Sequence, residues 1–499
     1  MNPKEQKILA EAQSFLSQNN ALSAREVLIN YSHKKKLGNQ GNFFLSISYA
    51  MTGNPKKANE IALKLLKKDP NEVEYLKLLG SCNHQLKNYD TAIKYFKRAL
   101  SIQKSDFQTL SNLASSLNEI KDYDESEKYF ISSLQLNPNQ PDALTNYGLL
   151  KQSQNNLDDA ISLHTKAIKL VPNHIGALYN LAYTLKNKGE VDAALNHYSA
   201  LLNYMPNNIK ALCDAAQIYA GKKQSENTLK LLLRAEEIEP ENEEVLQNLG
   251  IAYKKQQIDN KAREYFLKAI AINPNNKVVE YYLSMYNQDQ DTEAPPEEYI
   301  QGLFDDYADS FDEHLVKGLE YGIPKKIRNL LSQFIDSSKK YNILDLGCGT
   351  GLSGEALQDI ALNMTGVDLS PNMIKKAEER NVYNELVVSG IEEFLKSISP
   401  TKFDIIIAAD VFVYIGNLKD ILSLVSSTIQ KNGLFIFSTE STDLVETFTL
   451  QNTGRFAHNP EYIKQLGTEN GLIIKDIQEA IIRYENNMPI NGHIYTFMY

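Results

Sequence analysis

The sequence predicts a multidomain protein in which an all-α repeat array precedes an α/β domain with a mostly parallel sheet. Two observations support this fold class. Prolines recur through the first half at intervals of 34 residues or, once, of twice 34: Pro70, Pro138, Pro172, Pro206, Pro240 and Pro274. After residue 276 this period stops, and short apolar runs alternate with segments of helical periodicity. A chain of 499 residues, 42% of them hydrophobic, is long enough for each part to bury its own core.

Small and bulky side chains follow the same 34-residue register. Small residues recur at Ala58, Ala92, Ser126, Ala160, Ala194, Thr228 and Ala262, and again at Gly80, Ala114, Gly148, Ala182, Ala216 and Gly250. Four places after the first set, one helical turn along the same face, bulky residues recur at Phe96, Phe130, His164, Tyr198, Leu232 and Phe266. We expect paired helices to approach closely at the small residues, because a larger side chain would hold them apart.

The pattern is kept best in Leu249-Gly250-x-x-Tyr253, Ala262, Phe266, Ala269 and Pro274. It resembles the tetratricopeptide repeat, a helix-turn-helix unit. We count seven units across residues 39–276, and residues 5–38 are expected to form a degenerate unit that caps the array. The resemblance implies a right-handed superhelix over residues 1–276, whose concave face holds a peptide or another protein.

Asparagine recurs at the sixth position of several repeats, as Asn112, Asn146, Asn180 and Asn248, with Asp214 at the equivalent place. A side-chain amide offers a donor and an acceptor to a peptide unit without reading its sequence. The series resembles the asparagine ladder of the O-linked N-acetylglucosamine transferases, which implies that these four residues bind an extended peptide. The alternative, that asparagine is simply common at this repeat position, stays open.

Charge and cysteine content exclude several classes of function. The net charge of −10 originates in residues 289–313, which hold ten acidic side chains and no lysine or arginine. The remainder is close to neutral and gives no long-range attraction for a phosphate backbone, so nucleic acid is not an expected partner. The cysteines, Cys82, Cys213 and Cys348, form no CxxC pair, so neither a disulfide framework nor a metal site is expected.

The sequence also lacks the patterns of a membrane protein. No run of 18 or more apolar residues occurs, and Met1 to Lys7 carry charge where a signal peptide would have an apolar core. We therefore expect a cytoplasmic protein without membrane insertion. Its expected partner is a protein or peptide on the concave face of the repeats.

A polar segment over residues 277–296, with Pro295-Pro296 near its end, is expected to link the array to a domain over residues 297–499. In that domain, short apolar runs bounded by Gly, Asp and Asn alternate with helical segments, which is typical of a parallel sheet covered on both faces. The predicted strands are residues 343–345, 365–368, 386–388, 403–408 and 434–438, followed by strands near 477–484 and 493–498. The last two are expected to form an antiparallel hairpin.

The first of these strands leads into Asp345-Leu-Gly347-Cys-Gly349-Thr-Gly351 and then into a helix. Glycines let the backbone approach a ligand, and a helix N-terminus offers free amide donors. The second strand ends at Asp368, whose carboxylate can accept hydrogen bonds from both hydroxyls of a ribose. These features predict a nucleotide-like ligand. The run from Gly349 to Gly354 also satisfies the dinucleotide pattern, so NAD binding is an alternative.

Asp345 stands two residues before the first glycine, and Gly366-Val-Asp368 is followed by Leu-Ser-Pro-Asn-Met373. Together these segments resemble the class I S-adenosylmethionine-dependent methyltransferases, which have a Rossmann-like fold. The resemblance implies S-adenosylmethionine as the cofactor. It also implies cofactor-binding roles for Asp345, Gly347, Gly349 and Gly351 around the methionine part, Asp368 on the ribose, and Leu369 and Met373 on the two faces of the adenine.

Two further segments resemble parts of this family. Phe403 to Tyr414 resembles the fourth strand, whose end, at Asp410, passes beneath the sulfonium. Phe304 to Leu315 resembles the cap helix of a bacterial subgroup in which repeats precede the methyltransferase domain. Tyr307 and Phe311, four residues apart, are expected on one face of this helix, over the cofactor, because aromatic rings attract a sulfonium. The alternative is an amphipathic helix simply packed on the sheet.

One position departs from the family pattern. Many relatives carry an acid at the end of the third strand that receives the adenine amino group, whereas this sequence has Gly390. The contact is therefore lost or reassigned. The backbone amide of Ile391 and the side chain of Glu392 are the candidates for replacing it.

Methyl transfer from a sulfonium is an in-line displacement, so the enzyme contributes alignment, charge and exclusion of water. The segment Gly454-Arg455-Phe-Ala-His458 matches the same repeat-bearing subgroup, and we predict that Arg455 or His458 faces substrate and that Tyr414 has a catalytic role. The predicted function is S-adenosylmethionine-dependent methyl transfer to a protein or peptide recruited by the repeats. Two alternatives stay open: an adaptor that binds cofactor without useful turnover, and a small-molecule O- or N-methyltransferase.

Overall fold

The computed structural model describes residues 3–287, 292–308, 311–312, 321–398, 402–485 and 488–499. The chain divides into two compact units, Met1–Lys222 and Lys223–Tyr499. This division falls inside the sixth 34-residue repeat. The last repeat helices therefore belong to the same unit as the α/β domain, and the predicted boundary near residue 276 lies within that second unit.

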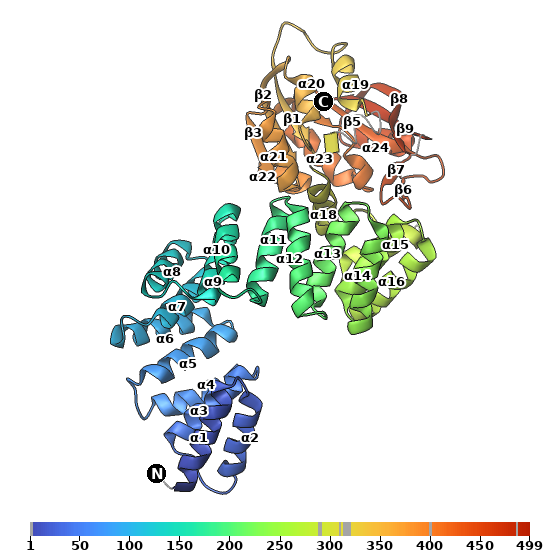
Figure 1. Ribbon diagram of the computed structural model, residues 1–499. Coiled ribbons are helices and arrows are strands. Elements are labelled where there is room, and N and C mark those ends of the chain that lie inside the picture. Colours follow the sequence, from blue (N-terminus) through green and yellow to red (C-terminus); the bar gives the residue numbers. More distant parts are fainter. Residues whose placement is uncertain (1–2, 288–291, 309–310, 313–320, 399–401, 486–487) are drawn as a thin grey trace. The chain divides into compact units, whose positions relative to one another are not determined.

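The first unit consists of antiparallel helix pairs that follow one another along the chain (Figure 1). Several helices begin at a side-chain cap, since the side chains of Asn54, Asp122 and Asn156 each accept a hydrogen bond from the backbone three residues on. The predicted N-terminal cap unit is also a helix pair. The helices of this unit are α1 Pro3–Ser17, α2 Ala21–Ser32, α3 Asn39–Met51, α4 Pro55–Leu66, α5 Val73–Gln85, α6 Tyr89–Ile102, α7 Phe107–Glu119, α8 Tyr123–Leu136, α9 Pro141–Ser153, α10 Leu157–Leu170, α11 Ile175–Asn187, α12 Val191–Tyr204 and α13 Ile209–Gly221.

The turn inside each repeat contains a residue with left-handed backbone. Glycine, the residue that adopts this conformation without strain, occurs at only two of these turns, and elsewhere a residue with a Cβ accepts a cost of about 1 kcal/mol. The residues with positive φ are Gly53, Lys87, Lys121, Asn155, Gly189, Lys223 and Gln257, again 34 apart. The fold thus repeats a backbone conformation that the residue types themselves do not reveal.

The helices of a repeat approach closely at the predicted small residues. A Cβ added to Gly80 would lie 2.5 Å from the Phe96 ring, and one added to Gly250 would lie 2.5 Å from the Phe266 ring. The phenyl ring of the second helix therefore packs on the bare backbone of the first, which explains the pairing of glycine with a bulky residue.

His164 occupies the bulky position of the fourth repeat. Its ring is fully buried against Gly148, and neither ring nitrogen has a hydrogen-bond partner within the described residues. Burial lowers the pKa of His164 to about 4. A neutral imidazole therefore fills the place of a phenyl ring, and leaves polar atoms unpaired in the core.

The second unit begins with the repeat helices α14 Ser225–Ile238, α15 Glu243–Lys255, α16 Asp259–Ile272 and α17 Lys277–Asn287. Helix α17 occupies residues that the sequence assigned to a linker. Val279, Tyr281 and Met285 of this helix are buried, and α17 packs on α16 as a continuation of the array. The predicted linker is thus helical over its first half, and residues 292–296 lead into α18 Glu297–Tyr307.

The α/β domain is built on a nine-stranded sheet. Its strands lie in the order β3-β2-β1-β4-β5-β7-β6, while β9 pairs with β5 and β8 pairs with β9. Strands β1 to β5 are mutually parallel, and β8 and β9 form the predicted antiparallel hairpin. The strands are β1 Tyr341–Leu346, β2 Ala361–Asp368, β3 Glu385–Val388, β4 Phe403–Ala408, β5 Ile429–Ser441, β6 Phe448–Leu450, β7 Phe456–His458, β8 Ile473–Glu485 and β9 Met488–Met498.

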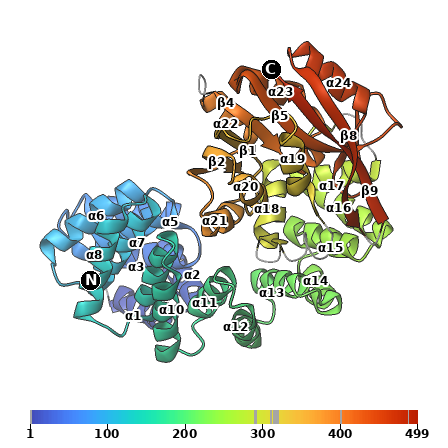
Figure 2. The same cartoon turned by 90° about the horizontal axis from the view of Figure 1, so that it is seen from above.

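Helices cover both faces of this sheet (Figure 2). Ile343 and Leu344, neighbours in β1, point to opposite faces and join different hydrophobic clusters. Helices α22, α23 and α24 pack with Leu344, and α19 and α20 pack with Ile343. The helices of this domain, with one 3₁₀ turn, are α19 Ile323–Leu331, α20 Leu352–Leu357, α21 Pro371–Glu379, α22 Ile391–Ser397, η2 Phe412–Tyr414, α23 Lys419–Thr428 and α24 Pro460–Glu469. None of the helices in the described ranges has the length and apolar character needed to cross a membrane.

Replacing His164 with phenylalanine is expected to stabilise the fourth repeat by about 1–2 kcal/mol, because it removes two unpaired buried nitrogens. The new ring should fit, since Phe96 and Phe266 already pack on glycine at equivalent positions. The wild type should also lose stability as the pH falls from about 6.5 towards 4, because the unfolded chain takes up the proton first. This residue contributes up to about 3 kcal/mol of that loss, which the variant avoids.

Hydrogen exchange of the α10 amides at pH 7 and pH 5 measures both effects. A variant whose α10 opens as readily as that of the wild type at both pH values would contradict the account of His164.

Candidate active site

The loop after β1 has a backbone conformation that glycine adopts most readily. The φ angle is +67° at Gly347, +52° at Gly349 and +91° at Gly351. Neighbouring side chains also approach closely, because a Cβ added to Gly347 would lie 2.6 Å from Val411. The three predicted glycines are therefore required by conformation, and they leave the main chain of the loop uncovered by side chains of their own.

Asp345, the last but one residue of β1, is almost completely buried. Its Oδ2 accepts a hydrogen bond of 2.6 Å from the Tyr383 hydroxyl, which in turn accepts one from the backbone N–H of Gly354. The other oxygen, Oδ1, has no partner within the described residues. The pKa of Asp345 is raised to about 7, mainly by burial and also by the nearby Asp368 carboxylate, while the bond from Tyr383 opposes the shift.

Asp368, at the end of β2, joins two loops. Its Oδ2 accepts a hydrogen bond of 2.8 Å from the N–H of Gly349, and its Oδ1 accepts one of 2.9 Å from the N–H of Ser370. Each carboxylate oxygen has capacity for a second donor. Half-buried Leu369 and buried Met373 follow it, and half-buried Ile391 begins α22 beyond the neighbouring strand.

Helix α18 contacts the same edge of the sheet. Asp305 accepts hydrogen bonds from the Ser370 hydroxyl and the Asn372 backbone, and Phe304 packs edge-on against Tyr414, with ring centres 5.2 Å apart. The predicted cap residue Phe311 also packs on Phe304, and its ring lies 3.9 Å from where a Cβ of Gly349 would stand. The side chain of Tyr307 lies outside the described residues.

A partly buried cluster of charged side chains follows the end of β4. Asp410 has a left-handed backbone, with φ at +59°, and its carboxylate accepts a hydrogen bond of 3.0 Å from Arg483. Arg483, only 1% exposed, also pairs with Glu440 and, at 2.8 Å, with Glu485. Arg455 pairs with Glu485 and lies 5.9 Å from the centre of the Tyr414 ring. Burying these charges is tolerated because each has a partner of opposite sign. We refer to Asp410, Glu440, Arg455, Arg483 and Glu485 as the charge cluster.

The residues at the ends of β1 and β2 fit the cofactor that the resemblance implies. Asp345 offers a buried oxygen without a partner, the glycine loop offers a cradle that side chains would fill, and Asp368 retains acceptor capacity for ribose hydroxyls. All three features lie at the carboxyl edge of a parallel sheet, where open α/β folds bind their ligands.

Comparison with known proteins gives the same assignment. Residues 337–486 match the family described as methyltransferase domain. Tetratricopeptide repeat families match residues 45–107, 106–173, 151–218 and 243–276. The chain combines tetratricopeptide repeats with a methyltransferase domain. The predicted fold class and the predicted resemblance are thereby confirmed.

Individual relatives resemble parts of the chain. The malonyl-[acyl-carrier protein] O-methyltransferase 2 of Ilyobacter polytropus is 30% identical over 139 residues, which are 27% of this chain and 51% of that protein. The ubiquinone biosynthesis O-methyltransferase of Rickettsia canadensis is 26% identical over 199 residues, 36% of this chain and 82% of that protein. A tetratricopeptide repeat protein of Parabacteroides merdae, known from a crystal structure, has a TM-score of 0.39 and 19% identity, covering 49% of this chain and 97% of that one. The chain thus spans about half of the length of the malonyl-[acyl-carrier protein] relative.

In the methyltransferase domain, the predicted substrate-side residues divide into two groups. Arg455 and Tyr414 lie together at the charge cluster, where the Arg455 Nε is 3.4 Å from the Tyr414 hydroxyl. His458 is fully buried elsewhere, and its Nε2 lies 2.9 and 3.0 Å from the carbonyls of Ile415 and Gly416. Burial lowers the pKa of His458 to about 4, so the ring is neutral and donates to these carbonyls. This geometry gives His458 the role of an anchor for the chain after η2.

The last repeat helix of the second unit holds the loop that carries Arg455. Tyr281 and Met285 of α17 pack with Leu450 and Phe456 in one hydrophobic cluster. The buried Tyr281 hydroxyl donates a hydrogen bond of 3.0 Å to the carbonyl of Gly454. From α15, the Lys254 ammonium donates to the carbonyl of Asn452. The repeat helices therefore position a loop of the methyltransferase domain.

The predicted peptide-binding asparagines lie on the first helices of their repeats, in two different units. Asn112, Asn146 and Asn180 belong to the first unit and Asn248 to the second. Asn112 is exposed and the other three are half-buried, and the Asn146 amide donates to the Ser115 hydroxyl at 3.2 Å. Asp214, at the interruption of the series, accepts hydrogen bonds from Tyr179 and Lys186.

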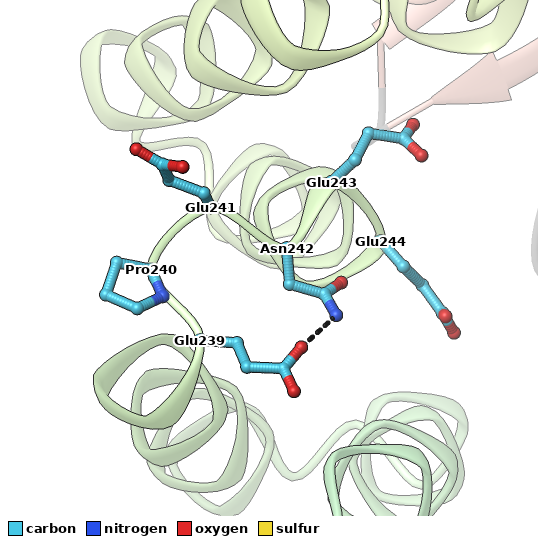
Figure 3. A pocket seen from close by; sticks show the side chains of 6 residues that line it. All are labelled: Glu239, Pro240, Glu241, Asn242, Glu243 and Glu244. Atoms are coloured by element: carbon cyan, nitrogen blue, oxygen red, sulfur yellow. Dashed lines mark hydrogen bonds between the residues drawn. The ribbon is translucent and has the colours of Figure 1, made fainter. Parts of the chain in front are cut away.

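A separate hollow lies beside the turn between α14 and α15 (Figure 3). All of its lining residues come from that turn and the start of α15. Asn242 donates to Glu239 across it, and Glu243 accepts from Asn276. The lining residues are Glu239, Pro240, Glu241, Asn242, Glu243 and Glu244. The hollow is an acidic surface feature of one inter-repeat turn and contains none of the predicted site residues.

Several residues of the site were not found from the sequence. Tyr383, which holds Asp345, lies 38 residues away from it in no recognisable motif. Glu440 and Glu485 reach the charge cluster from β5 and β8. In the sequence, nothing distinguishes them from other polar residues of a strand. Arg483, from β8, pairs with three acids in the same cluster, which is typical of a structural role. Sequence spacing carries no signal for contacts of this kind, because they depend on which strands become neighbours.

Changing Tyr281 to phenylalanine is expected to destabilise the loop that carries Arg455 by about 1–2 kcal/mol, because the buried Gly454 carbonyl loses its donor while the ring keeps its packing. Tyr286 of the same helix gives the matched control, since its hydroxyl contacts exposed Asp259 at 3.3 Å. Hydrogen exchange of the amides of residues 451–455 measures the effect. Equal exchange rates in the two variants would contradict an anchoring role for Tyr281.

Proposed function

We propose that this protein transfers a methyl group from S-adenosylmethionine to a protein or peptide that the repeats recruit. The use of S-adenosylmethionine is supported by the arrangement of residues at the ends of β1 and β2. There a buried carboxylate with an unpaired oxygen, Asp345, a loop of three positive-φ glycines and Asp368 share one edge of the sheet. The match of residues 337–486 to a methyltransferase domain, and the similarity to two O-methyltransferases, support the same reaction.

The chain's own residues explain binding. Asp345 accepts hydrogen bonds from the amino group of the methionine part through its free oxygen, and Asp368 accepts them from the ribose hydroxyls. Phe304, Phe311 and Tyr414 form an aromatic group above the glycine loop, where they exclude water and offer π electrons to a cation. When bound, S-adenosylmethionine supplies an activated methyl group on a sulfonium.

The charge cluster is suited to orienting the acceptor. Tyr414 follows β4 and lies beside Arg455, and Asp410 stands at the end of the same strand. Glu485 and Asp410 offer carboxylate oxygens to an acceptor that must lose a proton, and Arg455 offers N–H donors to an anionic one. Because alignment is the main requirement of an in-line transfer, these fixed side chains contribute by holding the acceptor atom in place.

Recruitment by the repeats is supported by the series of partly exposed asparagines in the first unit. A side-chain amide can pair with the backbone of an extended peptide whatever its sequence. A small-molecule acceptor is the second candidate, because the relatives are named for malonyl-[acyl-carrier protein] and for ubiquinone biosynthesis.

S-adenosylmethionine should bind more tightly at pH 7.5 than at pH 5.5, by about tenfold, because Asp345 has a pKa of about 7 and becomes protonated below it. A protonated carboxyl loses its charge attraction for the ligand's ammonium. Among the described residues, the other titratable groups that interact with Asp345 are Tyr383, Cys348, Asp368 and Tyr321. Calorimetric titration of the wild type and Asp345→Asn tests this, since the variant should lose most of the pH dependence. A wild type that binds NAD and not S-adenosylmethionine would refute the proposed function.

Labelled S-adenosylmethionine, incubated with the full chain and cell extract, should place the label in the protein fraction. Gly349→Arg is expected to abolish labelling, because a long side chain would fill the glycine cradle. Combined alanine substitution of Asn112, Asn146 and Asn180 should reduce protein labelling by about tenfold or more, since about 1 kcal/mol is lost with each amide contact.

The two candidate acceptors give different results in this assay. Label that appears only among low-mass products, and that is unaffected by the asparagine substitutions, would replace the protein acceptor with a small molecule. Absence of label from both fractions would favour a binding domain without turnover.

A further inference from the structure

The first turn of α18 lies against the loop that follows β3. Gly390 caps α22 with φ at −65° and ψ at 146°, a conformation that any residue adopts. A Cβ added there would have the Glu297 Oε1 as its nearest neighbour, at 3.4 Å. One oxygen of the Glu297 carboxylate therefore lies next to the position where a side chain at residue 390 would begin.

The loop after β3 is also the place that a base would reach from a ribose at Asp368. In the parallel pairing of β2 with β3, Asp368 is the register partner of Val388. The N–H of Ser389 donates a hydrogen bond of 3.0 Å to the Asp368 carbonyl. A purine on a ribose held by Asp368 would lie along Leu369 towards Ile391, and its edge would then face Gly390 and Glu297.

The exocyclic amino group of adenine is a donor and requires an acceptor when it leaves water. The N–H of Ile391 is itself a donor, so it can serve a ring nitrogen but not the amino group. The Glu392 carboxylate pairs with Lys396 of its own helix at 3.0 Å. Within the described residues, the Glu297 carboxylate has no hydrogen-bond or ion-pair partner, which leaves both of its oxygens available.

Helix α18 is held firmly enough to present such an acceptor. Before it, the Glu293 carbonyl accepts a hydrogen bond of 2.7 Å from the N–H of Gly416. Near its end, Asp305 accepts from Ser370 and Asn372. These contacts attach both sides of Glu297 to loops at the carboxyl edge of the sheet.

We propose that Glu297 accepts the hydrogen bond of the adenine amino group, and that the helix before the sheet thereby supplies the acid that the third strand lacks. The inference rests on the proposed function, because it assumes an adenine nucleoside at Asp368. Its consequence is that discrimination between adenine and other purines depends on α18, an element outside the matched residues 337–486.

Calorimetric titration of the full chain with S-adenosylhomocysteine and with S-inosylhomocysteine, which carries oxygen in place of the amino group, tests the proposal. In Glu297→Ala, affinity for the adenosine compound should fall by about tenfold, as expected for one charge-assisted hydrogen bond. Affinity for the inosine compound should stay equal or rise, because its oxygen no longer faces a carboxylate. A purely structural role would weaken both ligands alike.

Two further variants make the test specific. Glu298→Gln, at the adjacent position of α18, is the matched control and should bind both ligands as the wild type does. Gly390→Asp in the Glu297→Ala background should restore the preference for adenine, since position 390 has ordinary backbone and aspartate is a favoured helix cap.

Failure of this inference is distinguishable from failure of the proposed function. A wild type that binds neither ligand would overturn the proposed function. A wild type that binds S-adenosylhomocysteine, together with a Glu297→Ala variant of unchanged affinity and preference, would overturn the role of Glu297 alone.

Discussion

The carboxylate of Asp368 is the interaction on which the candidate site depends. By accepting from the backbone of Gly349 and of Ser370, it fixes the loops after β1 and β2 relative to each other. Ser370 in turn donates to Asp305, so the same residue group also fixes α18. This half-buried side chain thus connects the glycine loop, the loop after β2 and, through Ser370, α18. Burial raises the pKa of Asp368, while hydrogen bonds from Ser370 and Gly349 oppose that shift and favour its charged form.

The repeats and the methyltransferase domain are less separate than two domains joined by a linker. Tyr281 and Met285 of α17 pack on residues of β6 and β7. The Tyr281 hydroxyl also binds the carbonyl of Gly454, which precedes Arg455. The compact units accordingly divide at Lys222, before the last repeat helices. A physical consequence is that the loop at the charge cluster has part of its packing in the repeat array.

The close approach of the two helices of a repeat is the constraint that made the repeats recognisable in the sequence. Gly80 and Gly250 need a bare backbone because a phenyl ring lies 2.5 Å from where a Cβ would stand, and a small residue recurs at the same position of the other repeats. The charge cluster has no comparable periodic requirement. Its members come from four segments distant in sequence, and they are held together because an unpaired charge in that position would be costly.

The sequence by itself determined the repeat register, the succession of strands along the chain with its terminal hairpin, and the position of Asp345 and Asp368 near the ends of strands, because each is encoded locally by spacing, glycine conformation or strand ends. Only the tertiary structure decided that Tyr383 holds Asp345, that His458 binds carbonyls after η2, that residues 277–287 extend the array and that Glu297 stands beside Gly390. Such contacts join segments far apart in the chain. They follow from which elements pack together, and no local pattern of residues specifies that.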